Sequence, residues 1–115
     1  MILRGQIYWV QLDPSIGSEI KKTRPALIVS NNANNQVSDT VTVLPLTSQT
    51  KVIRPFEVLL PVGVGGLKVA SKAKANQIRT VDKQRLSDSP LGAAVDAAIL
   101  HRINGAIKIH LDIAE

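Results

Sequence analysis

The sequence predicts a mainly β protein, namely a small, partly closed antiparallel barrel with one C-terminal helix packed on it. Short runs of β-branched and apolar residues recur through the first two thirds of the chain, with turn-forming residues between them. After Ser89 the apolar residues fall four apart, which is the spacing of an amphipathic helix. With 115 residues, the chain is long enough for one domain, 1–115, and too short for two ordinary ones.

The first two predicted strands lie in the N-terminal third. One runs from Gly5 to Leu12 and stops at the Asp-Pro pair that follows, after which Ile16–Glu19 predicts a loop. The other, Pro25–Ser30, is an apolar run too short for a helix. The asparagine-rich segment 31–35 ends it and predicts a further loop.

Three more segments favour strands. Thr40–Leu46 is rich in β-branched residues, and Pro45 marks either its end or a bulge. Pro55–Leu60 and Leu67–Val81 follow, separated by the glycine-rich segment 62–66. No Lys-Ser/Thr pair and no helix follow these glycines, so they predict a hairpin turn rather than a phosphate-binding loop.

The C-terminal segment predicts a long helix. Ser89 is a good N-cap, and Pro90 suits the first helical position. A single apolar stripe then follows, made of Val95, Ile99, Ile103, Ile107 and Leu111.

The net charge of +5 is unevenly distributed. Residues 51–85 carry eight cations and two anions, whereas the rest of the chain is close to neutral. A basic segment favours a polyanionic partner through counterion release. A solvated lysine-rich surface that protects sheet edges explains the same charges equally well.

Several classes of protein and of site are disfavoured. Cysteine is absent, and the chain has neither a signal-peptide pattern nor an apolar run near the roughly 20 residues of a membrane span. A soluble cytoplasmic protein is therefore expected. His101 and His110 are nine apart, which favours surface or packing roles over metal ligation. Neither a metal nor a cofactor is expected.

A cluster of cations precedes the second predicted strand. Lys21, Lys22 and Arg24 lie just before the apolar run 26–29. Pro25 biases the backbone of Arg24 toward extended geometry, so the arginine should be held at the mouth of the strand. A fixed guanidinium in this place is suited to binding a phosphate.

Taken together and in order, five segments closely resemble the MazF/PemK toxins of bacterial toxin–antitoxin pairs. The resemblance covers nearly the whole chain, and its residues are Arg4–Val10, Leu12–Pro14 with Gly17–Glu19, Lys22–Val29, Leu44–Ser48 and Gln77–Lys83.

The resemblance implies a fold, an activity and partners. It implies the small SH3-like barrel of the MazF/PemK/CcdB-like fold and a homodimer. It also implies a metal-independent, ribosome-independent endoribonuclease that cuts single-stranded mRNA at short sequences, leaving a 2′,3′-cyclic phosphate and a 5′-hydroxyl. A cognate MazE-like antitoxin is expected to cover the RNA groove, and contact with operator DNA is expected only through that antitoxin.

The resemblance also implies site residues. In one branch of the family the essential pair is the arginine of the Arg-Pro motif and the threonine at a strand end, here Arg24 and Thr47. Arg24 could act as an electrostatic stabiliser or as a proton donor, and stabilisation is favoured because an arginine side chain stays protonated. RNA contacts are expected from Ser18, Glu19, Lys21, Lys22, Ser48, Gln77 and Arg79.

Two features depart from the family pattern or remain open. A second branch uses a histidine, an arginine and an aspartate where this chain has Ser18, Lys74 and Asn76, so only the Arg24/Thr47 mode is available. Arg79 also has a structural interpretation, as an ion pair with Asp82 at the end of the barrel.

Two other functions are compatible with the same fold. A gyrase-poison-like toxin acts without catalysis, but such toxins typically end in Trp-Gly-Ile, whereas this chain ends in Leu-Asp-Ile-Ala-Glu. An inactive RNA-binding barrel is the second alternative.

Overall fold

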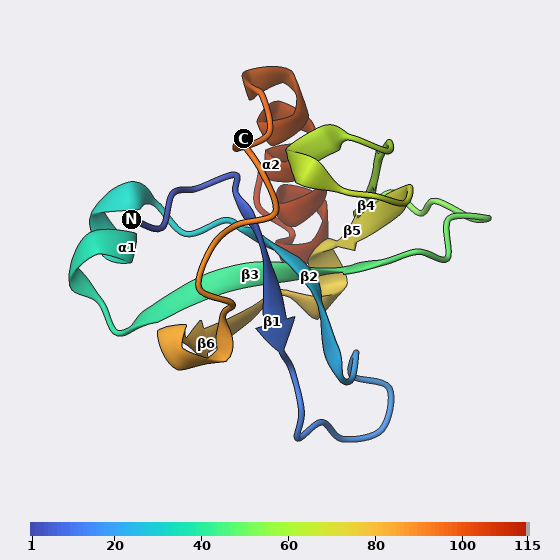
Figure 1. Cartoon of the computed structure of the whole chain (residues 1–115). Helices are drawn as coiled ribbons and strands as arrows, with labels where there is room; N and C mark the ends of the chain where they lie inside the picture. Colours follow the sequence, from blue (N-terminus) through green and yellow to red (C-terminus); the bar gives the residue numbers. More distant parts are fainter. Residues whose placement is uncertain (115) are drawn as a thin grey trace.

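The computed structural model describes residues 1–114, which form six strands and a long C-terminal helix (Figure 1). The strands are β1 (Ile7–Gln11), β2 (Thr23–Ile28), β3 (Thr40–Thr47), β4 (Glu57–Leu60), β5 (Ser71–Lys74) and β6 (Arg79–Asp82). The α-helices are α1 (Asn32–Val37) and α2 (Ala97–Leu111), and three 3-10 turns are η1 (Val64–Gly66), η2 (Ala75–Gln77) and η3 (Lys83–Arg85).

All strand pairs are antiparallel, in the order β1-β2-β3-β5-β4, with β6 also paired to β3. The sheet does not close into a full barrel. One isolated bridge between Val10 and Leu86 brings the chain beyond β6 back to β1, so the curvature is that of an open barrel. The predicted mainly antiparallel β fold with a C-terminal helix is confirmed.

The long strand β3 changes partners along its length. Its first half pairs with β6 up to Val43, and its last two residues, from Leu46 on, pair with β5. Pro45 lies between these two partners and pairs with Ala26 of β2 on the other edge. The strand continues through Pro45 to Thr47, so the expectation that Pro45 ends or bulges it was wrong. A proline is tolerated here because, on the edge that faces β5 and β6, this position has no strand partner.

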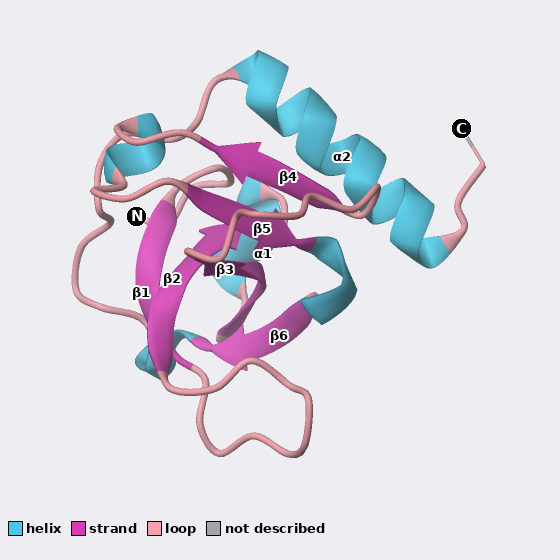
Figure 2. Ribbon diagram, turned by 90° about the vertical axis from the view of Figure 1, so that its right-hand side faces the viewer, coloured by secondary structure: helices cyan, strands magenta, loops and turns pink. Residues whose placement is uncertain are grey.

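Helix α2 packs across β4 and η2 (Figure 2). The main apolar core lies beneath it and includes Ile103 and Ala106 of the helix with Leu44 and Leu60 of the sheet. A second cluster of buried residues, from β1, β2, β3 and β6, fills the other side of the sheet. Within residues 1–114, no helix combines the length and apolar character needed to cross a bilayer.

The helix begins later than the sequence predicts. Its N-cap is Asp96, whose carboxylate accepts a hydrogen bond from the Ile99 N–H at 2.9 Å, rather than Ser89. The segment 87–95 instead runs along the open edge of β1, where Leu91 N–H donates to the Ile7 carbonyl at 2.8 Å. These tertiary hydrogen bonds satisfy an otherwise unpaired strand edge and outweigh the local capping signal.

Only the middle of the predicted apolar stripe is both helical and packed against the core. Ile103 is fully buried, and Ile99 and Ile107 pack against the core, but Leu111 is 49% exposed because the helix extends beyond the sheet there. Val95 is buried although it precedes the helix.

The asparagine-rich segment forms the short helix α1 and not the predicted loop. Asn31 caps it by accepting a hydrogen bond from Asn34 N–H at 2.8 Å. The buried side chain of Asn35 donates to the Ser30 carbonyl, so this asparagine stabilises the strand end that precedes it. Asparagines favour caps as much as turns, and the sequence did not separate the two.

The glycine-rich segment connects two antiparallel neighbours, as predicted, but through a longer connection than a tight turn. Leu60 pairs with Ser71, so residues 61–70 join β4 to β5 and contain η1. The segment Leu67–Val81 is not one strand, because η2 separates β5 from β6.

Candidate functional site

Arg24 is the second residue of β2 and faces an open pocket. Its Nε donates a hydrogen bond to the Lys21 carbonyl at 2.9 Å, which fixes the plane of the guanidinium. The side chain is half-buried, and within the described residues its Nη groups have no partner. The guanidinium is thus oriented by the backbone and retains donors for an anion.

The loop before β2 is shaped to hold Arg24 in this way. Lys22 has a left-handed backbone (φ 70°), and its carbonyl accepts a hydrogen bond from Leu12 N–H at 2.9 Å. Such a conformation costs a non-glycine residue roughly 1 kcal/mol and persists only where its surroundings enforce it. Figure 1 shows this loop extending from the sheet on the side opposite α2.

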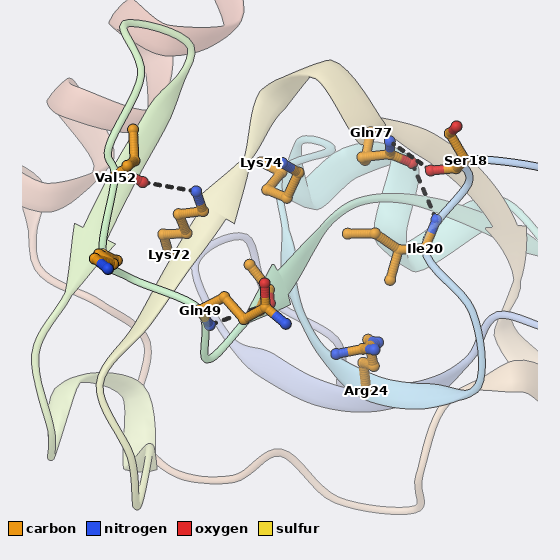
Figure 3. Close-up of a pocket in the computed structure, with 10 residues that line it drawn as sticks. Ser18, Ile20, Arg24, Gln49, Val52, Lys72, Lys74 and Gln77 are labelled. Carbon is orange, nitrogen blue, oxygen red and sulfur yellow. Dashed lines mark hydrogen bonds between the residues drawn. The ribbon is translucent and has the colours of Figure 1, made fainter.

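Gln77 anchors the other side of the same loop. Its Oε1 accepts a hydrogen bond from Ile20 N–H at 3.3 Å, and its Nε2 donates to the Ser18 carbonyl at 3.4 Å (Figure 3). Both polar atoms of the Gln77 side-chain amide are therefore engaged with the backbone of the loop. Its observed role is to position the loop.

Thr47 is the last residue of β3 and lines the same pocket as Arg24. Its Oγ1 accepts a hydrogen bond from Gln49 N–H at 3.3 Å. In the described part of the chain its hydroxyl hydrogen has no acceptor, so it is available to a ligand. Across the sheet, Thr47 is the register partner of Lys72 on β5.

The pocket has a volume of about 410 Å³ and is strongly basic. Figure 3 shows Arg24 on one side, Lys72 and Lys74 on another, and Gln77 with Ser18 beyond them. Its lining holds four cations and no carboxylate, and consists of Ser18, Ile20, Arg24, Thr47, Gln49, Lys51, Val52, Lys72, Lys74 and Gln77.

A buried carboxylate lies behind two of these cations. The side chain of Glu57 is 0% exposed, and it accepts from Lys72 Nζ at 2.9 Å and from Lys74 Nζ at 2.8 Å. Its Oε1 also accepts from Arg54 N–H, and Lys72 Nζ donates to the Val52 carbonyl at 2.7 Å. The two lysines are therefore held in fixed directions.

The carboxyl group of Glu57 stays ionised. Burial alone raises its pKa, but the hydrogen bonds from Lys74, the Arg54 N–H and Lys72, together with the charge of Lys74, outweigh burial and lower the pKa to about 2. At neutral pH the cluster is one anion between two cations.

The other predicted RNA-binding residues are distributed around the pocket. Glu19 and Arg79 line an adjoining cavity that shares Ser18 and Gln77 with the first. Lys22 and Ser48 line a third cavity, on the other side of Arg24. The side chain of Lys21 is exposed outside these cavities, and its carbonyl holds Arg24.

The predicted ion pair between Arg79 and Asp82 does not form. Arg79 Nη1 donates to the Leu12 carbonyl at 2.9 Å, and Asp82 caps η3 through Gln84 N–H. Within residues 1–114 the salt bridges are the two made by Glu57. Arg79 and Asp82 are three apart on β6, so their side chains lie on opposite faces of the strand.

Several residues in and behind the pocket have no motif that marks them in the sequence. They are Gln49, Lys51 and Lys72, and the buried Glu57 behind them, whereas Lys74 stands out only as a departure from the second branch of the family. The sequence does contain a signal that these two lysines act together, because Lys72 and Lys74 are two apart on one strand and so share a face. Their partner Glu57 lies on a neighbouring strand, which only the register reveals.

The residues described here offer no evident metal centre. No group of three or more His, Asp or Glu side chains within residues 1–114 lies close enough to share an ion. His101 and His110 are exposed on α2, and the ring of His110 lies 6.4 Å from that of Phe56.

Known proteins are similar to this chain in sequence and in fold. Residues 3–111 match the family described as PemK-like, MazF-like toxin of type II toxin-antitoxin system. Endoribonuclease MazF9 of Mycobacterium tuberculosis is 42% identical over 118 residues, covering 98% of each chain. Endoribonuclease EndoA of Bacillus subtilis is 32% identical, covering 96% of this chain and 95% of its own.

A solved structure agrees with these sequence relatives. An endoribonuclease in complex with its cognate antitoxin, from a mycobacterial species, superposes with a TM-score of 0.80 and 31% identity, covering 100% of this chain and 99% of that one. From the matched range, the identities and the shared fold, the chain belongs to the PemK-like, MazF-like toxin family of type II toxin–antitoxin systems, which includes endoribonucleases.

Proposed function

We propose that this protein is the toxin of a type II toxin–antitoxin pair and a sequence-specific endoribonuclease acting on single-stranded mRNA. The observation that carries the proposal is that Arg24 and Thr47 line one basic pocket, each with hydrogen-bond donors left free. The endoribonuclease names of MazF9 and EndoA support it. Because its substrate is mRNA, the protein acts in the cytoplasm.

The proposed reaction uses the nucleophile of the substrate. The 2′-oxygen of one ribose forms a bond to the adjacent phosphorus as the bond from phosphorus to the 5′-oxygen breaks. The 2′-hydroxyl proton leaves to solvent, and the 5′-oxygen gains a proton from solvent. The products are a 2′,3′-cyclic phosphate and a 5′-hydroxyl, and the reaction needs neither a metal nor the ribosome.

Arg24 acts in this scheme by electrostatic stabilisation. Negative charge grows on the non-bridging oxygens during in-line attack, and the Nη groups, which have no partner in the described residues, bind two of them. The bond from Nε to the Lys21 carbonyl orients the guanidinium before the RNA arrives, so little reorganisation is needed in the transition state.

Thr47 donates its hydroxyl to the same phosphate. Its Oγ1 accepts a hydrogen bond from Gln49 N–H, which leaves the hydroxyl hydrogen to donate to a ligand. Ser18, Glu19 and Ser48 lie on either side of the pair and contact bases or sugars of the flanking nucleotides. The loops 15–23 and 47–54 that carry them set the cut sequence.

The protein forms a homodimer and is silenced by a MazE-like antitoxin. The complex of a related endoribonuclease with its cognate antitoxin supports the second statement. An antitoxin segment rich in Asp and Glu complements a pocket lined by four cations, and it competes with RNA for them.

One experiment tests the nuclease directly. Purified protein is incubated with a long single-stranded RNA and excess EDTA, and the 5′ ends of the products are mapped. We expect cuts at one repeated short sequence, with 5′-hydroxyl ends that polynucleotide kinase labels without prior phosphatase. Intact RNA from a folded protein rejects the proposal and favours a non-catalytic toxin or an RNA-binding barrel.

A further inference from the structure

Glu57 is a fully buried carboxylate between two lysines of the pocket. Burying three charges is costly, and such a cluster is often no more stabilising than apolar residues of similar size. Stability alone therefore does not account for a Lys-Glu-Lys cluster at this position, and its geometry points to a use in binding.

The cluster lies beside the residues of the proposed chemistry. Lys72 is the register partner of Thr47, and Glu57 is the register partner of Lys74. Side chains of such partners share a face of the sheet, with Cβ atoms about 4.5–5.5 Å apart. Lys72 and Lys74 thus face the same pocket as Thr47 and Arg24.

The lysines keep donors for a ligand after their internal contacts are made. An ammonium group has three donors. Lys72 uses two of them, on Glu57 and the Val52 carbonyl, and Lys74 uses one, on Glu57. The remaining hydrogens are available to an anion in the pocket, where the side chain of Lys74 is 21% exposed and that of Lys72 10%.

The same carboxylate ties a loop to the pocket. The residues between β3 and β4 are joined to the cluster at two points, through the Val52 carbonyl and the Arg54 N–H. Glu57 therefore fixes two ammonium directions and one loop backbone together, which is what preorganisation of a binding site requires.

We propose that Lys72 and Lys74 bind an RNA phosphate next to the scissile one, and that Glu57 is the positioning residue that aims them. The identity of this anion as RNA rests on the proposed function. The charges support the assignment, because Arg24 with Thr47 serves one phosphate and Lys72 with Lys74 offers a second group of donors in the same pocket.

Substitution of Glu57 separates positioning from simple charge balance. Glu57→Gln keeps the shape and an acceptor for the Arg54 N–H but removes one negative charge. If Glu57 only dampens the positive field, the variant binds RNA more tightly. If Glu57 aims the lysines, the variant binds more weakly in spite of its higher net charge.

The test measures the binding of a short, mixed-sequence 2′-O-methyl RNA, which lacks the attacking hydroxyl. Dissociation constants are taken between about 50 and about 200 mM salt for wild type, Lys74→Gln, Glu57→Gln and the control Lys108→Gln, an exposed lysine on α2. Losing one phosphate contact lowers the slope of log K against log salt by about 0.7 for single strands. Thermal unfolding of each variant confirms that it is folded.

We expect Lys74→Gln to lose about 0.7 of slope, Glu57→Gln to bind more weakly, and Lys108→Gln to match wild type. An unchanged slope in folded Lys74→Gln overturns the inference, as does tighter binding by folded Glu57→Gln. If Glu57→Gln does not fold, the slope of Lys74→Gln decides, because that variant leaves Glu57 paired with Lys72. Wild type that binds but does not cut RNA rejects the nuclease proposal alone.

Discussion

Two parts of the basic pocket differ in how their charges are compensated, and we call them the Glu57 wall (Glu57, Lys72 and Lys74) and the Arg24 wall (Arg24 and Thr47). On one wall, Lys72 and Lys74 are paired with a fully buried Glu57, and every oxygen of that carboxylate is occupied. On the other wall, Arg24 and Thr47 are each fixed by one hydrogen bond to the backbone and meet no carboxylate.

This difference separates stability from activity. A paired, buried charge loses its compensation when one member is removed, so changes in the Glu57 wall should destabilise the fold. A half-exposed cation whose donors are free gains little from its present contacts, so changes in the Arg24 wall should affect chemistry and leave the fold intact.

Removing the buried carboxylate should have the largest effect. Glu57→Ala leaves two ammonium groups uncompensated and the Arg54 N–H without its acceptor, so we expect a loss of about 3–5 kcal/mol in the free energy of unfolding. Chemical denaturation measures it. The exposed Glu19→Ala serves as control and should lose less than about 1 kcal/mol. Equal losses in both variants would show that the wall is not an interlocked unit.

Removing the free guanidinium of Arg24 should raise the activation free energy of cleavage by nearly as much as Glu57→Ala lowers the free energy of unfolding. We expect Arg24→Ala to cleave RNA on the order of 10²–10³ more slowly, because one preorganised stabiliser of the transition state is lost. Its free energy of unfolding should stay within about 0.5 kcal/mol of wild type. Arg102→Ala, on the exposed face of α2, should cleave normally. Full activity in folded Arg24→Ala removes this residue from the mechanism.

Acid should weaken the paired wall selectively. The pKa of Glu57 is lowered from 4.5 to about 2 on folding, so its stabilising contribution is fully present above about pH 4.5 and disappears as the pH falls toward 2. That difference corresponds to roughly 3 kcal/mol. Urea unfolding across this range measures it, and Glu57→Gln should flatten the decline. An equally steep decline in folded Glu57→Gln assigns the acid sensitivity to other carboxylates.

The smallest effect is expected at Thr47. Thr47→Val keeps the shape of the side chain but removes the donor to the phosphate, which is worth about 1.5–3 kcal/mol when the partner is charged. Cleavage should therefore fall roughly 10- to 100-fold. Thr42→Val changes the same residue type on the same strand, where the hydroxyl contacts Thr80, and it should leave the rate unchanged. Equal rates in wild type and Thr47→Val exclude the hydroxyl from the reaction.

Local sequence predicted the elements whose signals agree with their tertiary surroundings. The alternating run around Ile7–Gln11 and the β-branched run Thr40–Thr47 form strands as expected, because their patterns match the faces they bury. The position of Arg24 at the mouth of β2 also followed from the sequence, since Pro25 restricts the backbone before it.

The errors arose where a distant partner overrides a local signal. Ser89 and Pro90 carry a good helix start, but the open edge of β1 draws their segment into hydrogen bonds with Ile7 and Gly5. Pro45 carries a strand-ending signal, but β3 passes through it where its partners change. Neither partner lies within the window that a propensity argument uses.

By itself, the sequence determined the fold class and the basic character of the chain, because period and charge can be read along the chain, and the order of its motifs carried the family resemblance that implies Arg24 and Thr47 as the site. Only the tertiary structure decided that Lys72 and Lys74 lie beside Thr47, and that Glu57 is buried between them. The reason is that strand register brings together residues from separate parts of the chain, and burial then sets the pKa and the direction of each charge.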